Sequence, residues 1–325
     1  SADSVFFGGG TPSLLEPVEV ASIIETCRES FSLSPGTEIT LEANPETVSF
    51  EKLVGFKSSG VTRLSYGVQS FRDDELVRLS RLHSANGARE AVGFARAAGF
   101  NNVSLDLMMW LPQQSVSQWL ESVDSLIGLD PDHASLYLLE LYPGAPLREE
   151  MAQQRWSLAP DDDAADMYLE GMAKLDTAGY HQYEISNVAK PDRESRHNLK
   201  YWTDGEWLGF GCGAHSTRDG VRWMNRSGTE DYIKSVKNRG LAPINTRKLT
   251  KEEQLEETLF TGLRLASGID LGKISHRYGV DVWAKFRNEL QVFLDRGLLR
   301  YDQGCLKLTR HGMLLSHEVM RVFVS

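Results

Sequence analysis

The segment Val5–Ser13, VFFGGGTPS, joins an apolar run to three consecutive glycines. Its first three residues predict a short buried strand, and the glycines predict a strand-to-helix turn because glycine adopts positive φ at no steric cost. Three glycines exceed what a turn needs, since each loses more backbone entropy on folding than other residues do. Their bare N–H and C=O groups also suit a small polar ligand. The residues alone leave both interpretations open, a permissive turn or a ligand-binding loop.

Four more strand-like runs follow, separated by amphipathic stretches, and this alternation is typical of a parallel α/β sheet. The predicted strands are Val5–Phe7, Glu38–Leu41, Arg63–Tyr66, Asn102–Leu107 and His133–Leu139. The predicted helices between them are Pro17–Phe31, Phe50–Ser58, Ala85–Ala98 and Val116–Leu126. Glycine or polar residues follow each strand, and the carboxyl ends of parallel strands form the ligand face of such folds. We therefore favour a barrel or partial barrel whose mouth binds a polar ligand.

Three polar side chains stand at consecutive strand ends, namely Glu42, Gln69 and Asp106. Solvated loop residues would look the same, but their shared position at the mouth favours a joint role. Arg81, in LSRLHS, could pair with one of them or bind a ligand carboxylate with two hydrogen bonds. The glycine loop lacks the GK[ST] ending of a phosphate loop, which argues against ATP.

Composition narrows the class of protein. The formal net charge of −10 argues against a nucleic-acid binder, and no apolar run is long enough to span a bilayer. The first residues show neither a signal peptide nor a transit peptide, which predicts a cytoplasmic protein. The three cysteines, Cys27, Cys212 and Cys305, are far apart and show no metal-ligand spacing, as expected of free thiols in a reducing compartment.

The length of 325 residues suits one large α/β domain and a smaller one, and we place the boundary at 240/241. In residues 241–325 we predict helices over 252–266, 271–278 and 282–296, a hairpin near 302–304 and a final helix from 309. Three helices, a small β wing and another helix resemble a winged helix.

The stretch RHNLKYW, Arg196–Trp202, places a metal-capable imidazole beside two aromatic rings. Tyr201 and Trp202 could be core anchors with His197 in a turn. Alternatively, the three could hold a flat aromatic ligand, with His197 Nε2 as the axial ligand of a heme iron. His215, in GAHS, is a second histidine nearby, either a further axial ligand or a residue of the barrel mouth.

An ordered set of motifs resembles the sequence pattern of a known protein family. GGGTPSLL, ITLEANPETV, RLSYGVQSF, LSRLHS, SLDLM with LPQQ, DHASLYLLEL, QYEISN, RHNLKYW and GFGCGAHS cover nearly the whole chain in one order. Together they resemble the radical S-adenosylmethionine (SAM) proteins of the oxygen-independent coproporphyrinogen oxidase family. The HNLKYW pattern is similar to the heme-chaperone branch of that family, and the C-terminal segment is similar to its small helical, winged domain.

The resemblance implies a partial (β/α)6 radical SAM barrel that binds SAM and a [4Fe-4S] cluster at its mouth. It also implies heme, hemoprotein acceptors and an electron donor for the cluster as partners, and it leaves a homodimer open. The residues that match SAM-contacting positions of the family are Gly9, Gly10, Thr11, Glu42, Gln69, Arg81 and Asp106. Those that match its heme-binding motif are His197, Tyr201 and Trp202, with His197 as the iron ligand.

This sequence also departs from the family pattern. The family's CxxxCxxC loop follows a first barrel strand that precedes GGGTP, and neither falls within these residues, so the resemblance assigns the cluster no metal ligand in this chain. Trp110 stands where the family usually has glycine, and Cys212 stands where it has proline. The resemblance thus favours a radical SAM heme chaperone. A coproporphyrinogen III oxidase, which decarboxylates two propionates, and a cluster-free binding scaffold are the alternatives.

Overall fold

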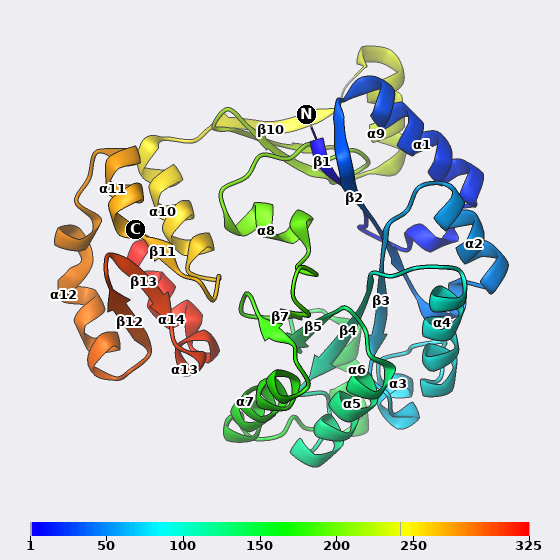
Figure 1. Cartoon of the computed structure of the whole chain (residues 1–325), viewed down its shortest axis with the longest axis horizontal. Coiled ribbons are helices and arrows are strands. Elements are labelled where there is room, and N and C mark those ends of the chain that lie inside the picture. Colours follow the sequence, from blue (N-terminus) through cyan, green and yellow to red (C-terminus); the bar gives the residue numbers. More distant parts are fainter. Residues whose placement is uncertain (1, 241, 325) are drawn as a thin grey trace. The chain divides into compact units, whose positions relative to one another are not determined.

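The computed structural model describes residues 2–240 and 242–324, and it divides into two compact units, Ser1–His197 and Asn198–Ser325. Figure 1 labels their helices and strands. The domain boundary predicted at 240/241 stays a prediction, and residue 241 lies outside the described residues. In the described part of the chain, no helix has the length and apolar character needed to cross a membrane.

A curled, mixed sheet of seven strands organises the first unit. In space the strands run β1-β2-β3-β4-β5-β7-β6. The first five are parallel, β7 is antiparallel to β5, and β6 is antiparallel to β7. This is the predicted partial barrel, and the five predicted parallel strands are confirmed. The strand bounds are β1 Ala2–Phe7, β2 Leu33–Ala43, β3 Arg63–Gln69, β4 Val103–Met109, β5 His133–Leu138, β6 His181–Gln182 and β7 Asn187–Ala189.

Helices follow the strands and lie outside the curl of the sheet (Figure 1). They are α1 Pro17–Ser30, α2 Phe50–Ser58, α3 Asp73–Arg78, α4 Ala85–Ala97, α5 Val116–Leu129, α6 Pro146–Gln154 and α7 Asp161–Thr177, with 3-10 turns η1 Pro12–Leu14 and η2 Pro45–Thr47. Helices α2, α4 and α5 begin after Ser49, Ser84 and Ser115, whose hydroxyls accept N–H groups of the first turn. Each such cap contributes about 1 kcal/mol, which fixes where these helices begin.

The core lies between the outer face of the sheet and these helices. In β3, Leu64 and Tyr66 point outward, and the Tyr66 hydroxyl donates to the Ala91 carbonyl of α4 at 3.3 Å. Because side chains alternate along a strand, Arg63 and Ser65 point to the concave face. The inner face therefore carries polar groups, while the apolar residues of the same strands build the core.

Helices α5 and α7 pack closely at one end of the parallel sheet. The Trp119 indole N–H, fully buried in α5, donates to the Met167 carbonyl of α7 at 2.7 Å. Gly171 faces that indole, and a Cβ there would lie only 2.8 Å from Trp119 Nε1. A glycine at this position lets the two helices approach.

The second unit contains two small antiparallel sheets and a group of helices. One sheet has the order β10-β9-β8, and its hairpin turn at Asp219 and Gly220 has positive φ at both residues, as tight hairpin turns require. The other has the order β11-β13-β12 and packs with helices, in agreement with the predicted helices and hairpin. The elements are α8 Arg196–Trp202, which begins in the first unit, β8 His215–Arg218, β9 Val221–Asn225, α9 Thr229–Arg239, β10 Pro243–Lys248, α10 Lys251–Gly262, β11 Ile269–Asp270, α11 Leu271–Tyr278, α12 Val282–Asp295, β12 Leu299–Asp302, β13 Cys305–Leu308, α13 Arg310–Leu314, α14 Ser316–Met320 and η3 Arg321–Phe323.

Candidate functional site at the carboxyl edge of the sheet

The three glycines after β1 differ in what the fold requires of them. A Cβ on Gly8 would lie 2.7 Å from Phe6 Cε1 and 3.0 Å from Glu42 Oε2, so packing excludes a side chain there. Gly9 has φ +84°, which favours glycine. Nothing lies within 4 Å of a Cβ on Gly9 or Gly10, and both residues are exposed. The loop therefore presents bare backbone to open space beside Glu42.

A polar group links the ends of β1, β2 and β3. Arg81 Nη2 donates to Asn44 Oδ1 at 2.7 Å and to the Gly67 carbonyl at 2.8 Å. Asn44 Nδ2 donates to Thr11 Oγ1 at 3.5 Å. Arg81 is therefore a partly buried residue of this edge, with neutral oxygens as its hydrogen-bond acceptors, and these bonds hold its guanidinium in place.

Gln69 joins this group through an irregular end of β3. Its φ is +69°, and the β3–β4 register shifts between Tyr66 and Gln69. A Cβ on Gly67 would lie 3.0 Å from Gln69 Nε2, 3.2 Å from Arg81 Nη2 and 3.3 Å from Asn44 Oδ1. Gly67 thus lets three polar side chains converge on one point of the backbone.

Gly67→Ala is expected to push the Arg81 and Gln69 side chains apart. The protein should lose about 1 kcal/mol of unfolding free energy, because the neighbours must shift by a few tenths of an ångström. The affinity for SAM, the ligand that the resemblance implies for this edge, should fall severalfold. Chemical denaturation and calorimetric titration with SAM measure the two effects. Gly93→Ala is the matched control, because its Cβ meets nothing within 4 Å inside α4. Equal loss of SAM binding in both variants would contradict the packing argument.

Two carboxylates lie on β2 and β4. Glu42 is the last residue but one of β2, whereas Asp106 lies in the middle of β4, because that strand continues to Met109 beyond its predicted end. Burial raises the pKa of Asp106 to about 6, although Ser135, Arg63 and Ser65 favour its charged form. Ser65 Oγ donates to Asp106 Oδ1 at 3.4 Å. Burial first, and then the Asp106 charge, raise the pKa of Glu42, while the Gly9 N–H and Arg63 lower it. The two acids therefore share one electrostatic environment, as expected for side chains that converge at the mouth.

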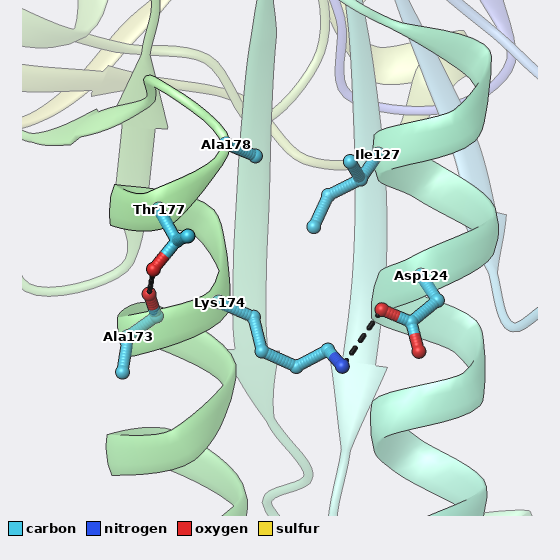
Figure 2. A pocket seen from close by; sticks show the side chains of 6 residues that line it. All are labelled: Asp124, Ile127, Ala173, Lys174, Thr177 and Ala178. Carbon is cyan, nitrogen blue, oxygen red and sulfur yellow. Dashed lines mark hydrogen bonds and ion pairs between the residues drawn. The ribbon is translucent and has the colours of Figure 1, made fainter.

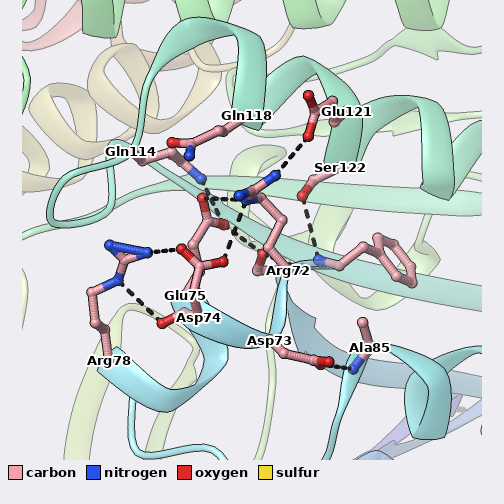
Figure 3. Close-up of polar contacts among 12 residues, drawn as sticks. Arg72, Asp73, Asp74, Glu75, Arg78, Ala85, Gln114, Gln118, Glu121 and Ser122 are labelled. Carbon is pink, nitrogen blue, oxygen red and sulfur yellow. Dashed lines mark hydrogen bonds and ion pairs between the residues drawn. The ribbon is translucent and has the colours of Figure 1, made fainter.

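A buried network braces the loops after β3 and β4 (Figure 3). The Glu75 carboxylate is fully buried, and its Oε2 accepts hydrogen bonds from Ser70 Oγ at 2.5 Å and Gln114 Nε2 at 3.0 Å. Arg72 lies between two carboxylates. Its Nε is 3.7 Å from Glu75 Oε1, and its Nη1 is 2.7 Å from Glu121 Oε2 of α5. Burial raises the pKa of Glu75. Because Ser70 follows Gln69 directly, the network fixes the polar end of β3.

His197 packs against Ser4 and Phe6 of β1. Its ring stacks on Phe6 with centroids 4.9 Å apart and an interplanar angle of 22°. Its Nδ1 lies 3.0 Å from Ser4 Oγ. The backbone N–H groups of Arg196 and His197 donate to the Glu38 carboxylate at 3.2 and 3.1 Å, which ties the start of α8 to β2. The imidazole is therefore held by residues far from it in sequence.

Tyr201 and Trp202, on the same helix, belong to the second unit. Tyr201 packs edge-on against Trp207, with centroids 4.7 Å apart, and the Arg264 guanidinium lies 4.2 Å from the Trp202 ring centroid. His215 is exposed at the start of β8. The described contacts of both aromatic rings are structural, and their role toward a ligand stays a prediction.

The comparisons with known proteins agree with the ordered motifs. The Radical SAM superfamily model matches residues 2–126, and the HemN C-terminal domain model matches residues 249–315. The heme chaperone HemW of Bacillus subtilis is 36% identical over 322 residues, which cover 99% of this chain and 85% of that protein. The chain belongs to the radical SAM superfamily, in its HemW-like group.

Other members of this group have similar sequences. The HemW of Haemophilus influenzae is 33% identical over 99% of this chain and 83% of its own length. The Bos taurus radical S-adenosyl methionine domain-containing protein 1, mitochondrial, is 38% identical over 99% of this chain and 74% of its own length. The structure of the coproporphyrinogen III oxidase HemN from Escherichia coli covers 99% of this chain and 77% of that one, with a TM-score of 0.83 and 23% identity. It confirms the radical SAM fold.

A radical SAM fold implies two bound groups, SAM and an iron–sulfur cluster, and the residues of this chain fit only the first. The open glycine backbone and the Glu42 and Asp106 carboxylates fit the amino and hydroxyl groups of SAM. An iron–sulfur cluster does not fit the residues of this chain. Cys27, Cys212 and Cys305 are free thiols, and residues 2–240 and 242–324 contain no group of three or more His, Cys, Asp or Glu suited to a metal.

Trp110, one of the two departures from the radical SAM pattern, occupies left-handed backbone with φ +62°. Such a φ favours glycine, which accounts for glycine as the usual family residue. The indole N–H donates to the Ala159 carbonyl at 2.8 Å, so the ring is tied to the segment before α7. Cys212 lies exposed between two glycines with positive φ, and its Sγ is 3.7 Å from Thr229 Oγ1.

A pocket of about 440 Å³ lies between α5 and α7 (Figure 2). Its lining includes Ile127, Ala173 and an ion pair of 2.8 Å between Lys174 and Asp124. None of the residues predicted from the sequence to bind SAM or heme lines it. We therefore place the candidate site at the carboxyl edge of the sheet and at His197.

Sequence reasoning missed several residues of this edge. Asn44 was visible in the EANP motif, and Gly67 in GVQS, but neither spacing nor residue type distinguished them from loop residues. Arg63 and Ser135 lie inside strands, where a polar residue usually marks a solvated face. Only the parallel pairing of β2, β3, β4 and β5 brings them beside Glu42 and Asp106.

Proposed function

We propose that this chain binds heme through His197 and passes it to acceptor hemoproteins, with SAM bound at the carboxyl edge of the sheet. The observation that carries the proposal is the environment of His197. A histidine that binds iron through Nε2 usually donates its Nδ1–H to a second group. The Ser4 hydroxyl, 3.0 Å from Nδ1, can accept that bond when Nδ1 carries the proton, and the Nε2 lone pair then faces the iron.

The neighbours of His197 fix the ring. Phe6 stacks on one face of the imidazole, Ser4 sets its rotation, and Glu38 accepts the backbone N–H groups at the start of α8. An imidazole held in this way loses little freedom when it binds iron, which favours binding. An acceptor protein can then take the heme when its own axial ligand replaces His197 at the iron. That Tyr201 and Trp202, which belong to the second unit, also contact heme stays a prediction from the sequence.

SAM would lie against the glycine loop. The Gly9 and Gly10 backbone and the Glu42 carboxylate suit its ammonium group, Asp106 suits its hydroxyl groups, and Arg81 with Gln69, Asn44 and Thr11 supplies further polar contacts. When bound, SAM would supply the sulfonium group on which radical SAM proteins base their chemistry. In this chain, Glu42 and Asp106 bind and orient the ligand, and the Glu75 network holds the loops in place.

Three relatives named heme chaperone HemW support the chaperone proposal, with 36, 33 and 34% identity over 99% of the chain. The HNLKYW pattern also favours it over the oxidase. The likeness to HemN, at 23% identity, concerns the fold alone and carries no argument for the oxidase reaction.

Titration of the purified chain with hemin tests the proposal. We expect a saturable Soret band typical of histidine-ligated heme, and transfer of that heme to an apo-hemoprotein in a spectroscopic assay. A broad spectrum of unligated hemin that does not saturate would contradict heme binding at a defined site. Anaerobic incubation with coproporphyrinogen should give no protoporphyrinogen, and turnover would instead support the oxidase.

A further inference from the structure

Arg63 opens β3 and is a nearly completely buried arginine, 2% exposed. It pairs in the sheet with Thr40 of β2, and Ser65, two residues further on, pairs with Glu42. Since alternate residues share a face, Arg63 and Ser65 lie below the carboxylates on the concave side. No hydrogen-bond acceptor among the described residues contacts its Nε. Burial of such a charge is costly unless other charges compensate for it.

The titratable groups that face Arg63 come from several elements. Its charge acts on Glu42 of β2, Asp106 of β4, His133 of β5 and Tyr183 in the turn before β7. Burial first, and then Arg63, hold the pKa of His133 well below 6.5. The His133 ring is neutral at pH 7, with Nδ1 2.8 Å from Ser104 Oγ and Nε2 2.8 Å from the Tyr183 hydroxyl. Arg63 therefore supplies the positive charge next to the two acids.

The two acids need that charge. Each is partly buried, and the Asp106 charge raises the pKa of Glu42, so ionisation of one opposes ionisation of the other. Tyr137 also faces both carboxylates and stays protonated, because burial and their charges raise its pKa. Arg63 lowers the pKa of both Glu42 and Asp106. A neutral side chain in its place would leave two repelling carboxylates at a partly desolvated edge.

We propose that Arg63 is a positioning residue of the SAM site: from beneath the sheet edge, its buried guanidinium keeps Glu42 and Asp106 ionised as a pair of anions that face the ligand. The inference rests on the proposed SAM site and deepens it. Arg63 acts through the two acids and does not touch the ligand. Its role differs from that of Arg81, whose guanidinium is hydrogen-bonded at the edge itself.

The first experiment measures the acids directly, without any ligand. Aspartate labelled with 13C at the carboxyl carbon is followed by NMR from pH 4 to 9, and Asp106→Asn identifies the Asp106 signal. In the wild type we expect a midpoint near the Asp106 pKa of about 6. Arg63→Met should raise the midpoint by about one pH unit, because removal of a nearby cation favours the protonated acid. Arg63→Lys should restore it in part. An unchanged midpoint in Arg63→Met would overturn the inference.

The second experiment measures SAM affinity by calorimetry at pH 6 and pH 8. Arg63→Met removes the cation and should weaken SAM binding by about tenfold at pH 6, because a larger fraction of both acids is then protonated than in the wild type. At pH 8 both acids are ionised in either protein, so the affinity of Arg63→Met should equal or exceed the wild-type value. A purely structural defect would lower affinity equally at both pH values and would overturn the proposal. If Arg63→Met does not fold, Arg63→Gln replaces it in both experiments.

The two proposals fail in different ways. If the wild-type chain does not bind SAM at either pH, the proposed SAM site fails, while the NMR midpoints still test whether Arg63 controls the acids. If the wild type binds SAM and Arg63→Met shows the wild-type pH dependence, the SAM site stands and the role of Arg63 is wrong.

Discussion

His197→Ala is expected to lower the hemin affinity of this chain at least tenfold and to abolish the Soret band of histidine-ligated heme. The iron–imidazole bond is the directional contact in the proposed site, and neither Phe6 nor Ser4, which pack against the imidazole, can replace it. Phe6 has no donor atom, and the Ser4 hydroxyl is a poor iron ligand. Absorbance titration and resonance Raman spectroscopy measure the affinity and the axial ligand.

Three variants make this result specific. His181→Ala removes an exposed histidine of the same unit, on β6, and should bind hemin like the wild type. Ser4→Ala should keep the Soret band and weaken binding by only a fewfold, since it removes the bond to Nδ1 and not the iron ligand. His215→Ala shows whether the second histidine contributes to hemin binding. A His197→Ala protein with the wild-type spectrum and affinity would refute the proposed site.

Asp106→Asn is expected to stabilise the protein while it weakens SAM binding. The pKa of Asp106 is raised to about 6 in the folded protein from an ordinary value of 3.8. Between these values the folded protein binds more protons than the unfolded chain, so stability falls as the pH rises through this window. Above pH 6 the folded state carries the full cost of the partly buried charge, about 3 kcal/mol. Asparagine is nearly isosteric and lacks that charge.

Chemical denaturation at pH 5 and pH 8 measures this effect. The gain in unfolding free energy for Asp106→Asn should be largest at pH 8 and clearly smaller at pH 5, where Asp106 is mostly protonated in the folded state. Asp124→Asn, which alters an exposed acid paired with Lys174, is the matched control and should change stability by less than about 1 kcal/mol at either pH. A loss of stability at pH 8 in Asp106→Asn would contradict the prediction, because it would show that neighbouring groups compensate for the Asp106 charge.

Much of the fold could be predicted from local patterns. The five parallel strands, the serine-capped helices and the helices and hairpin of residues 251–314 follow from periodicity, caps and turn residues. Helices α3, α6 and α9 were missed, because they are short or largely exposed and carry little apolar periodicity. His197 was assigned to a turn or to a ligand site, and the structure places it in the first turn of α8.

The sequence by itself determined which groups are available at the mouth: bare glycines after the first strand, and Glu42, Gln69 and Asp106 on the next three strands or directly after them. Their meeting follows from a simple rule, because the carboxyl ends of parallel strands share one edge. Only the tertiary structure decided what surrounds them. Parallel strands are joined by long crossovers, so contacts such as Ser4 with His197 join residues 193 positions apart. Burial, which sets the pKa of Asp106 and gives Arg63 its role, depends on all of these packed elements together and has no local signature.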